Sequence, residues 1–191
     1  MERTISSEDV MHPRVYLIGP SGSGKTVIAQ RIGKLTGWAV IDTDAEIRDQ
    51  AGKSIADIFE DDGEDEFRRR ELNLLNSIAE SRNHLIVATG GGLPVIPTAM
   101  QTMLNTGITI YLEASAEELW TRILNDLNER PLLRGPDGFQ RLQCLITQRA
   151  PIYRMATVTV RTERLTVQQV VKLVLSQLSD FHTPTDSDFE D

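Results

Sequence analysis

An eight-residue segment, GPSGSGKT at residues 19–26, limits the possible folds of this chain more than any other feature. It follows an apolar run, and three of its residues are glycines, which cost backbone entropy wherever they are fixed. The spacing Gly19-x4-Gly24-Lys25-Thr26 matches the strand–loop–helix turn whose backbone N–H groups hold phosphate. The sequence therefore predicts a nucleotide site, with Lys25 on the β- and γ-phosphates and the Thr26 hydroxyl on Mg²⁺.

The rest of the chain favours a kinase that uses ATP. The competing dinucleotide pattern G-x-G-x-x-G fails, because the third residue after Gly24 is Val27. The chain also lacks the guanine-reading motif N-K-x-D, and no apolar strand ends in the Asp-Glu pair common in ATP-driven machines. These absences favour a small-molecule kinase over a GTPase switch or an ATPase. The predicted ATP site contains Gly22, Ser23, Gly24, Lys25, Thr26 and Val27.

Composition narrows the class of protein further. A chain of 191 residues with 40% apolar content suits one globular domain. Its net charge of −8 argues against general binding of nucleic acid or of anionic membranes. Cys144 is the only cysteine, which rules out an intrachain disulfide and a zinc site built on a cysteine pair. Since there is no apolar leader and no run of membrane-spanning length, we expect a cytoplasmic protein, and we expect a monomer.

Strand-like runs alternate with helical patterns along the chain. The first predicted helix, 25–37, has Ile28, Ile32 and Leu35 on one face and Gly37 as its stop. Nearly continuous apolar strands that alternate with helices predict an α/β fold, with a parallel sheet covered on both faces. Ligands then bind at the carboxyl ends of the strands, where GPSGSGKT, DTD and TGGG occur. The predicted strands are 14–19, 38–42, 84–92, 108–113 and 157–162.

Three regions depart from this alternation. Residues 43–83 hold several helical stretches in one crossover, which predicts a small insertion that binds substrate. Residues 125–138 are rich in charge, Pro and Gly, and are predicted to form a mobile lid. We expect a single kinase domain over residues 1–178, and an acidic, disordered tail over 179–191. Capping boxes are predicted at Ser115 with Glu118 and at Thr166 with Gln169.

A second group of polar residues suggests an acceptor site. Asp42 could hold Mg²⁺ through water, and Asp44 could accept a proton from an attacking hydroxyl. The alternative is an Asp that simply caps a helix. In GEDEFRRRE, Arg68 and Glu71 share a helical face, whereas the neighbouring Arg69 and Arg70 are expected on a solvated face. Two further arginines, Arg130 in the predicted lid and Arg149 near the end of a helix, lie in segments expected on the same side of the sheet.

The order of these motifs resembles the shikimate kinase family, in the nucleoside-monophosphate-kinase-like branch of P-loop proteins. The resemblance covers about residues 14–165 and rests on GPSGSGKT, DTD, SIADIFEDDGEDEFRRRE, GGG, RPLL and RAPIY. It implies a five-stranded parallel sheet of order 2-3-1-4-5 with helices on both faces. It also implies ATP-dependent phosphorylation of the 3-hydroxyl of shikimate.

The resemblance assigns roles to particular residues. Lys25, Asp44 and Arg130 would be catalytic, with Asp44 on the reacting hydroxyls and Arg130 reaching from the lid to the transferring phosphate. Arg122 and Arg164 would border the adenine. Thr26 and Asp42 would hold the metal. The acceptor site would comprise Asp44, Arg68, Gly90, Gly91, Gly92 and Arg149, with Glu71 orienting Arg68 and Phe59 and Phe67 as walls.

Two alternatives remain open from sequence. The first is a gluconate kinase or another small-acid kinase on the same frame, whose acceptor segment differs from GEDEFRRRE. The second is a catalytically silent relative that binds ligand as a regulatory module. The presence of Lys25, Asp44, Arg68, Arg130 and Arg149 argues against the second.

Overall fold

The protein is a three-layer α/β sandwich around one parallel sheet. The computed structural model describes residues 14–124, 133 and 135–179. Its sheet has the order β2-β3-β1-β4-β5, and every neighbouring pair is parallel, as predicted. The strands are β1 (Arg14–Ile18), β2 (Ala39–Asp42), β3 (Leu85–Ala88), β4 (Ile108–Glu113) and β5 (Val158–Arg161).

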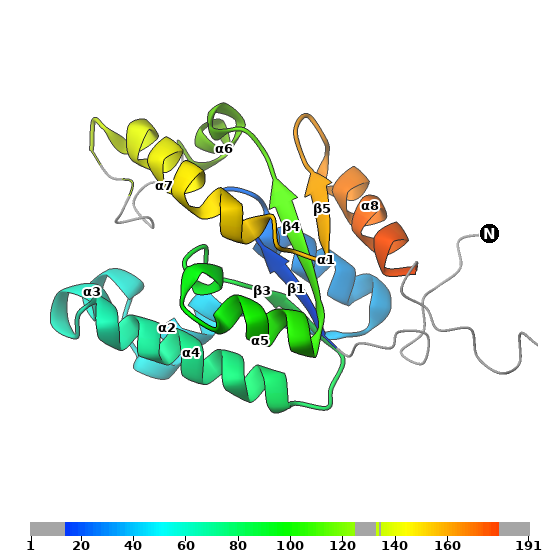
Figure 1. The fold of residues 1–191 in the computed structure, drawn as a ribbon, viewed down its shortest axis with the longest axis horizontal. Coiled ribbons are helices and arrows are strands. Elements are labelled where there is room, and N and C mark those ends of the chain that lie inside the picture. The colour runs from blue at the N-terminus through cyan, green and yellow to red at the C-terminus, as the bar shows by residue number, and fades with distance from the viewer. Residues whose placement is uncertain (1–13, 125–132, 134, 180–191) are drawn as a thin grey trace, which may run out of the picture.

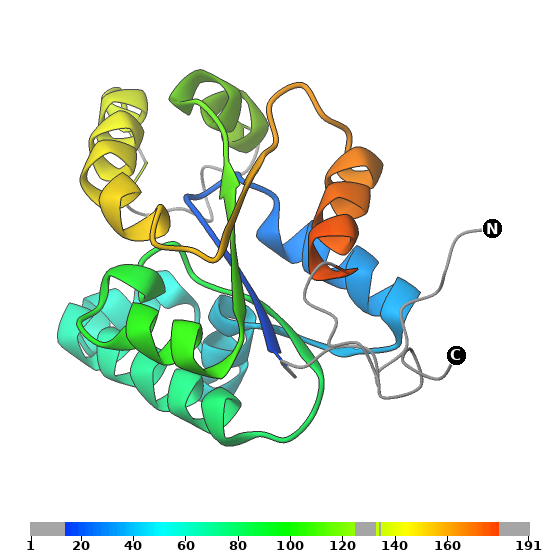
Figure 2. The ribbon, with the colours of Figure 1, turned by 45° about the vertical axis from the view of Figure 1, so that its right-hand side comes forward.

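Helices cover both faces of the sheet (Figures 1 and 2). On one face α1 packs beside α8, and on the other lie α4 and α5, with the end of α7 (Figure 2). The short 3₁₀ helix η1 (Leu93–Val95) follows β3. The α-helices are α1 (Lys25–Thr36), α2 (Thr43–Ala51), α3 (Ile55–Asp61), α4 (Glu64–Glu80), α5 (Ala99–Thr106), α6 (Ala116–Ile123), α7 (Gly138–Tyr153) and α8 (Val167–Ser179).

Alternating side chains of β1 show how the sheet is buried. Val15 and Leu17 join the cluster under α1 and α8, whereas Tyr16 and Ile18 join the cluster under α4 and α5. All four are fully buried. A strand in the middle of a sheet covered on both faces is apolar along its whole length, which explains its continuous hydrophobic pattern.

Helix α1 differs from the prediction at one position. Ile28 and Ile32 are buried, but Leu35 is 53% exposed. The helix instead approaches the sheet through Gly33, where an added Cβ would collide with the side chain of Val40. Because a glycine allows this close approach, the buried face of α1 turns toward residue 33 and away from Leu35.

The crossover from β2 to β3 contains the three helices α2, α3 and α4, which share a small core. Ile47, Ile58 and Phe67 form that core, one residue from each helix. Ser54 starts α3 with a full capping box to Asp57, in which each side chain accepts from the other's backbone N–H. Residues 43–83 therefore carry a compact cluster of helices beside the sheet.

The two predicted capping boxes have different outcomes. At α8, Thr166 and Gln169 make both reciprocal hydrogen bonds. At α6, Ser115 accepts from the N–H of Glu118, but the N–H of Ser115 donates to Glu163, so that box is only half formed. Most of the predicted lid and the tail beyond Ser179 lie outside the described residues. In the part of the chain that the structure describes, no helix is long and apolar enough to cross a membrane.

Candidate active site

The phosphate loop joins the end of β1 to the start of α1. Gly24 has a left-handed backbone, with φ of 89°, and α1 begins at the next residue. Such a φ is easily adopted only by glycine, and it directs the loop's N–H groups and the helix N-terminus into one space. The ammonium of Lys25 donates to the carbonyls of Gly19 and Pro20, both at 2.8 Å. All six predicted ATP-site residues line this hollow: Gly22, Ser23, Gly24, Lys25, Thr26 and Val27.

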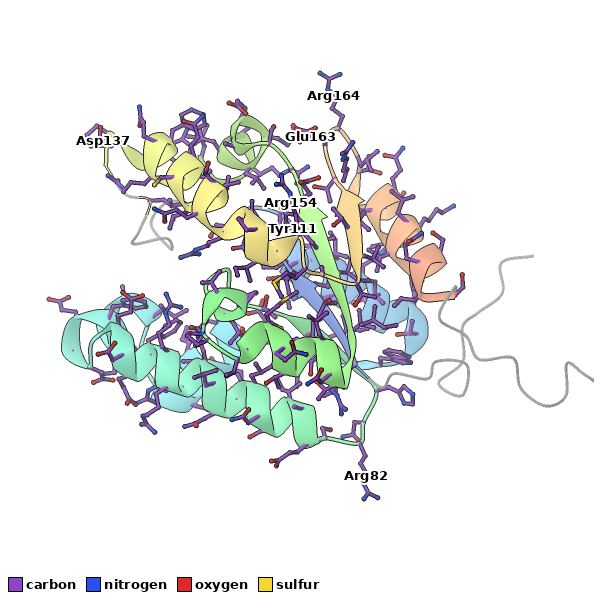
Figure 3. All side chains as sticks on the ribbon, in the orientation of Figure 1. Arg82, Tyr111, Asp137, Arg154, Glu163 and Arg164 are labelled. Atoms are coloured by element: carbon purple, nitrogen blue, oxygen red, sulfur yellow. The ribbon has the colours of Figure 1, made fainter. Side chains whose placement is uncertain are left out.

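The far end of this nucleotide hollow contains one of the two arginines expected beside adenine. Arg122 on α6 donates to the carbonyl and the hydroxyl of Thr162, at 2.8 and 3.2 Å, and to Glu118. These bonds fix its guanidinium beside Thr162, and both residues line the hollow. Arg164 is exposed and extends from the loop after β5 toward solvent (Figure 3). The structure therefore brings Arg122, but not Arg164, to the nucleotide hollow.

Thr26 and Asp42 meet directly, although they lie on different elements. The Thr26 hydroxyl donates to Asp42 Oδ2 at 2.5 Å. The other carboxylate oxygen of Asp42 accepts from the N–H groups of Asp44 and Ala45, both at 3.1 Å, so Asp42 is also the N-cap of α2. The capping alternative is therefore correct for Asp42, and it leaves one carboxylate oxygen facing the phosphate loop.

Asp44 lies at the junction of two hollows. It lines the nucleotide hollow and also a second cavity of ≈ 190 Å³, which we call the acceptor hollow. Ser21 and Gly91 are likewise common to both. A carboxylate at this position can face a group bound in the acceptor hollow and the phosphates at the same time.

The acceptor hollow brings together most of the predicted acceptor residues. Its lining includes the predicted Asp44, Phe59, Phe67, Arg68, Glu71, Gly91, Gly92 and Arg149. Gly90 lies just behind this wall, because a Cβ there would collide with Asp44 and come within 2.9 Å of Glu71 Oε1. Thr43 holds that glycine in place, since its buried hydroxyl accepts from the Gly90 N–H at 2.7 Å.

Arg68 and Glu71 form a partly buried ion pair in this hollow. Arg68 donates to Glu71 Oε2 at 2.6 Å and to the exposed Glu64 at 2.9 Å. Burial raises the pKa of Glu71 to about 7; Arg68 opposes the shift, nearby Asp44 adds to it, and Arg149 opposes it weakly. Burial alone would lower the pKa of Arg68, but Glu71 and Glu64 outweigh it, so the pKa is raised and the guanidinium stays charged. The neighbouring Arg69 is exposed, as predicted, and pairs with the half-buried Glu66.

Aromatic rings form one wall of the acceptor hollow. Phe59 and Phe67 lie with ring centroids 4.8 Å apart, and the Arg68 guanidinium lies 5.4 Å from the Phe67 centroid. That separation permits a cation–π contact, which holds the arginine's plane against the wall. A hollow with an apolar wall and a fixed guanidinium suits a small ring that carries a carboxylate.

Several lining residues were not predicted from the sequence. Leu133, Leu142 and Leu145 supply apolar surface from the segment before α7 and from α7 itself, and Ile55 adds more from α3. Tyr153 is the last residue of α7 and the last letter of the RAPIY motif, so the motif was a signal that could have found it. Arg130, predicted to be catalytic, lies outside the described residues.

The geometry of the two hollows defines a class of protein. A phosphate loop, a Thr–Asp pair beside it and an arginine-lined hollow beyond a shared carboxylate are the parts of a P-loop phosphotransferase for a small anionic acceptor. Among the described residues no group of three or more His, Cys, Asp or Glu side chains forms a metal centre.

Comparisons with known proteins narrow that class to one family. The family model described as shikimate kinase matches residues 21–179. Shikimate kinase from Nitrosococcus oceani is 38% identical over 87% of this chain and 87% of its own length. Shikimate kinase from Mycobacterium ulcerans is 40% identical over 89% of this chain and 91% of its own length. The chain belongs to the shikimate kinase family.

Solved structures agree at the level of fold. Shikimate kinase from Acinetobacter baumannii, in complex with shikimate, aligns with a TM-score of 0.85 and 34% identity over 91% of this chain and 96% of that one. A gluconokinase from Sinorhizobium meliloti aligns with a TM-score of 0.60 and 18% identity, over 88% of this chain and 93% of the gluconokinase. The second likeness shows the shared fold alone.

Proposed function

We propose that this chain transfers the γ-phosphoryl group of ATP to the 3-hydroxyl of shikimate, giving shikimate 3-phosphate and ADP. One observation carries the proposal: Asp44 lines both the phosphate-loop hollow and the acceptor hollow that contains Arg68 and Arg149. An acceptor held by its carboxylate at the arginines can present a hydroxyl to Asp44. That hydroxyl then faces the phosphates. The Acinetobacter relative, which was solved with shikimate, supports the choice of acceptor.

The chemistry assigned to the chain's own residues follows from their charges. Asp44 accepts the proton of the attacking hydroxyl as the new O–P bond forms and the bond to the ADP oxygen breaks. Lys25, which spans the loop carbonyls of Gly19 and Pro20, exchanges these partners for the β- and γ-phosphate oxygens. A cation at this position offsets the charge that develops on the transferring group.

Mg²⁺ is part of this proposal because the residues present fit it. The Thr26 hydroxyl at the start of α1 and Asp42 Oδ2 at the end of β2 are hard oxygen ligands that lie 2.5 Å apart. Thr26 would hold the ion directly, and Asp42 would hold it through water. When bound, Mg²⁺ supplies neutralisation of the phosphate charge.

Recognition of the acceptor is assigned to the arginines and the glycine segment. Arg68 and Arg149 present planar, paired donors that match a carboxylate, whereas a lysine offers only a point charge. Because the protein carries a net charge of −8, an anionic substrate must be bound by such local, partly desolvated cations. Phe59 and Phe67 would contact the ring.

The remaining assignments concern the predicted lid and the adenine. We propose that Arg130 reaches the transferring phosphate from a lid over residues 125–138, which would exclude water from the phosphoryl group. Arg122 would border the adenine. Arg164 is the second candidate for this role, and it is the weaker one because its side chain faces solvent (Figure 3). A monomer in the cytoplasm remains our proposal for its state and compartment.

A coupled assay of ADP release tests the function. With ATP and Mg²⁺, we expect turnover that depends on shikimate and none above background with gluconate. Turnover with gluconate in place of shikimate would favour the small-acid kinase alternative. Calorimetry with shikimate and a non-hydrolysable ATP analogue runs in parallel, because tight binding without turnover would identify a silent relative.

A further inference from the structure

The buried hydroxyl of Tyr153 connects α7 to the glycine segment after β3. Tyr153 is fully buried, and its hydroxyl donates to the carbonyl of Gly91 at 2.6 Å. The two residues are 62 positions apart in sequence. Since the bond spans two separate parts of the acceptor hollow, it does more than close a local turn.

The same hydroxyl lies beside Arg149, one helical turn earlier on α7. Burial raises the pKa of Tyr153, and the neighbouring Arg149 guanidinium partly opposes that shift. Arg149 also approaches the glycine segment, because a Cβ on Gly91 would stand 3.8 Å from its Nη1. The tyrosine hydroxyl therefore lies between two groups that we assign to the acceptor's carboxylate.

The orientation of one peptide plane gives this contact a chemical consequence. The C=O of Gly91 and the N–H of Gly92 belong to the same planar trans peptide, so they point in opposite directions. Fixing the carbonyl on Tyr153 fixes the direction of that N–H in a segment that lines the hollow. A carbonyl oxygen rotated into the hollow would repel a carboxylate, and glycines on both sides make such a rotation easy.

We propose that Tyr153 is a positioning residue for acceptor recognition, which orients the Gly91–Gly92 peptide and Arg149 toward the substrate carboxylate. The inference rests on the proposed function for the identity of the acceptor. Tyr153 acts on binding of the anion and not on phosphoryl transfer, because its hydroxyl bonds the Gly91 carbonyl beside Arg149. Its effect should therefore be confined to one substrate and one kinetic constant.

Tyr111 provides a matched control. Its ring on β4 packs against that of Tyr153 with centroids 5.2 Å apart, under the last turns of α7 (Figure 3). Tyr111 does not belong to the described residues that line the acceptor hollow. Tyr111→Phe and Tyr153→Phe thus remove the same atom from two rings in contact, and only the second removes the bond to Gly91.

The test is the steady-state kinetics of the two variants in the full chain. We expect Tyr153→Phe to raise KM for shikimate about tenfold, the scale of one hydrogen bond to a buried carbonyl, with kcat and KM for ATP within about twofold of wild type. Tyr111→Phe should leave all three constants within about twofold. An unchanged KM for shikimate in Tyr153→Phe, or an equal rise in both variants, would overturn the inference.

Two further measurements separate this inference from the proposed function. With an uncharged shikimate amide, Tyr153→Phe should lose little, because the anion whose recognition it serves is absent; a full tenfold loss with the amide would contradict the proposal. Calorimetric binding of shikimate is compared between wild type and both variants. If wild type binds shikimate without turnover, the proposed function fails, while a Kd ratio near ten for Tyr153→Phe still supports the positioning role and a ratio near one contradicts it.

Discussion

Arg68 donates a 2.6 Å hydrogen bond to Glu71, three residues along the same helix, and the Glu71 side chain is only 1% exposed. The bond helps to fix the guanidinium, which lies against the Phe67 ring, lines the hollow and donates from Nε and Nη2 to the exposed Glu64. A charge held in this way loses little rotamer entropy when a carboxylate binds. The pair therefore holds the guanidinium in place before substrate binds, and it does so by burying the Glu71 carboxylate.

The first prediction concerns the choice of arginine at this position. Arg68→Lys keeps the charge but removes the planar pair of donors, so it should weaken shikimate binding by about 2–4 kcal/mol and leave KM for ATP nearly unchanged. Arg69→Lys, which changes the exposed arginine at the next position, is the control and should behave as wild type. Steady-state kinetics with shikimate check both. Equal constants for the two variants would contradict carboxylate recognition by Arg68.

The second prediction tests Asp44 as the proton acceptor. Asp44→Asn keeps the shape of the side chain and removes its basicity, so kcat should fall by about 10²-fold or more. Shikimate binding should fall less, because an amide can still form a hydrogen bond to a hydroxyl. Asp49→Asn alters an exposed carboxylate on the same helix and serves as the control. A normal kcat for Asp44→Asn would reduce Asp44 to a structural role.

The third prediction concerns Lys25. Lys25→Ala should lower kcat by an amount equivalent to about 3–4 kcal/mol of transition-state stabilisation, as for other lost electrostatic partners. The fold should persist, since the ammonium donates to the loop carbonyls of Gly19 and Pro20 and to the Ser23 hydroxyl of the same loop. Thermal unfolding and circular dichroism check the fold, and Lys34→Ala on the exposed side of α1 is the control. Turnover close to that of wild type would exclude the assigned phosphate role.

The fourth prediction follows from the pKa of Glu71, which burial raises to about 7. A group whose pKa is higher in the folded than in the unfolded state binds its proton more tightly when folded. Its contribution to stability is therefore greatest below pH 4.5 and is lost as pH rises toward 7. Denaturant titrations give the free energy of unfolding of wild type and of Glu71→Gln. Between pH 4.5 and 7, the value for wild type should fall relative to the value for Glu71→Gln.

Other carboxyls titrate in the same range, so the comparison needs its own control. The pKa of Glu66 is lowered by its bond to Arg69. The stability that such a group contributes increases as pH rises, which is opposite to the effect of Glu71. Glu80→Gln changes an exposed carboxyl at the end of the same helix. Its titration measures the background from an exposed carboxyl, and a difference for Glu71→Gln that is no steeper than this background between pH 4.5 and 7 would show that Glu71 has an ordinary pKa.

Much of the fold could be predicted because local signals coincided with tertiary ones. Apolar runs ended in GPSGSGKT, DTD and TGGG, and a parallel sheet brings such ends to one edge whatever the details of packing. Leu35 was assigned wrongly because helical periodicity alone does not reveal that Gly33 lets α1 approach Val40. The half-formed box at Ser115 has a similar cause, since Glu163 reaches it from 48 residues away.

In the site, too, contacts within one helix could be predicted from the sequence, whereas contacts between distant segments could not. Arg68 and Glu71 could be paired from their spacing on one helix. The raised pKa of Glu71 could not be predicted, because it depends on burial and on Asp44 from another helix. Nor does any local pattern indicate that Tyr153 meets Gly91, since only the folded chain brings residues 62 positions apart to 2.6 Å.

The narrow junction between the two hollows has a consequence for the design of inhibitors. Among the described residues, the nucleotide and acceptor hollows share only Ser21, Asp44 and Gly91. The linker of a bisubstrate compound must therefore pass the Asp44 carboxylate between Ser21 and Gly91. This favours a slim, neutral or cationic linker over a bulky anionic one. Selectivity over other P-loop kinases would come from its acceptor half, because the phosphate loop is a device that many such enzymes use.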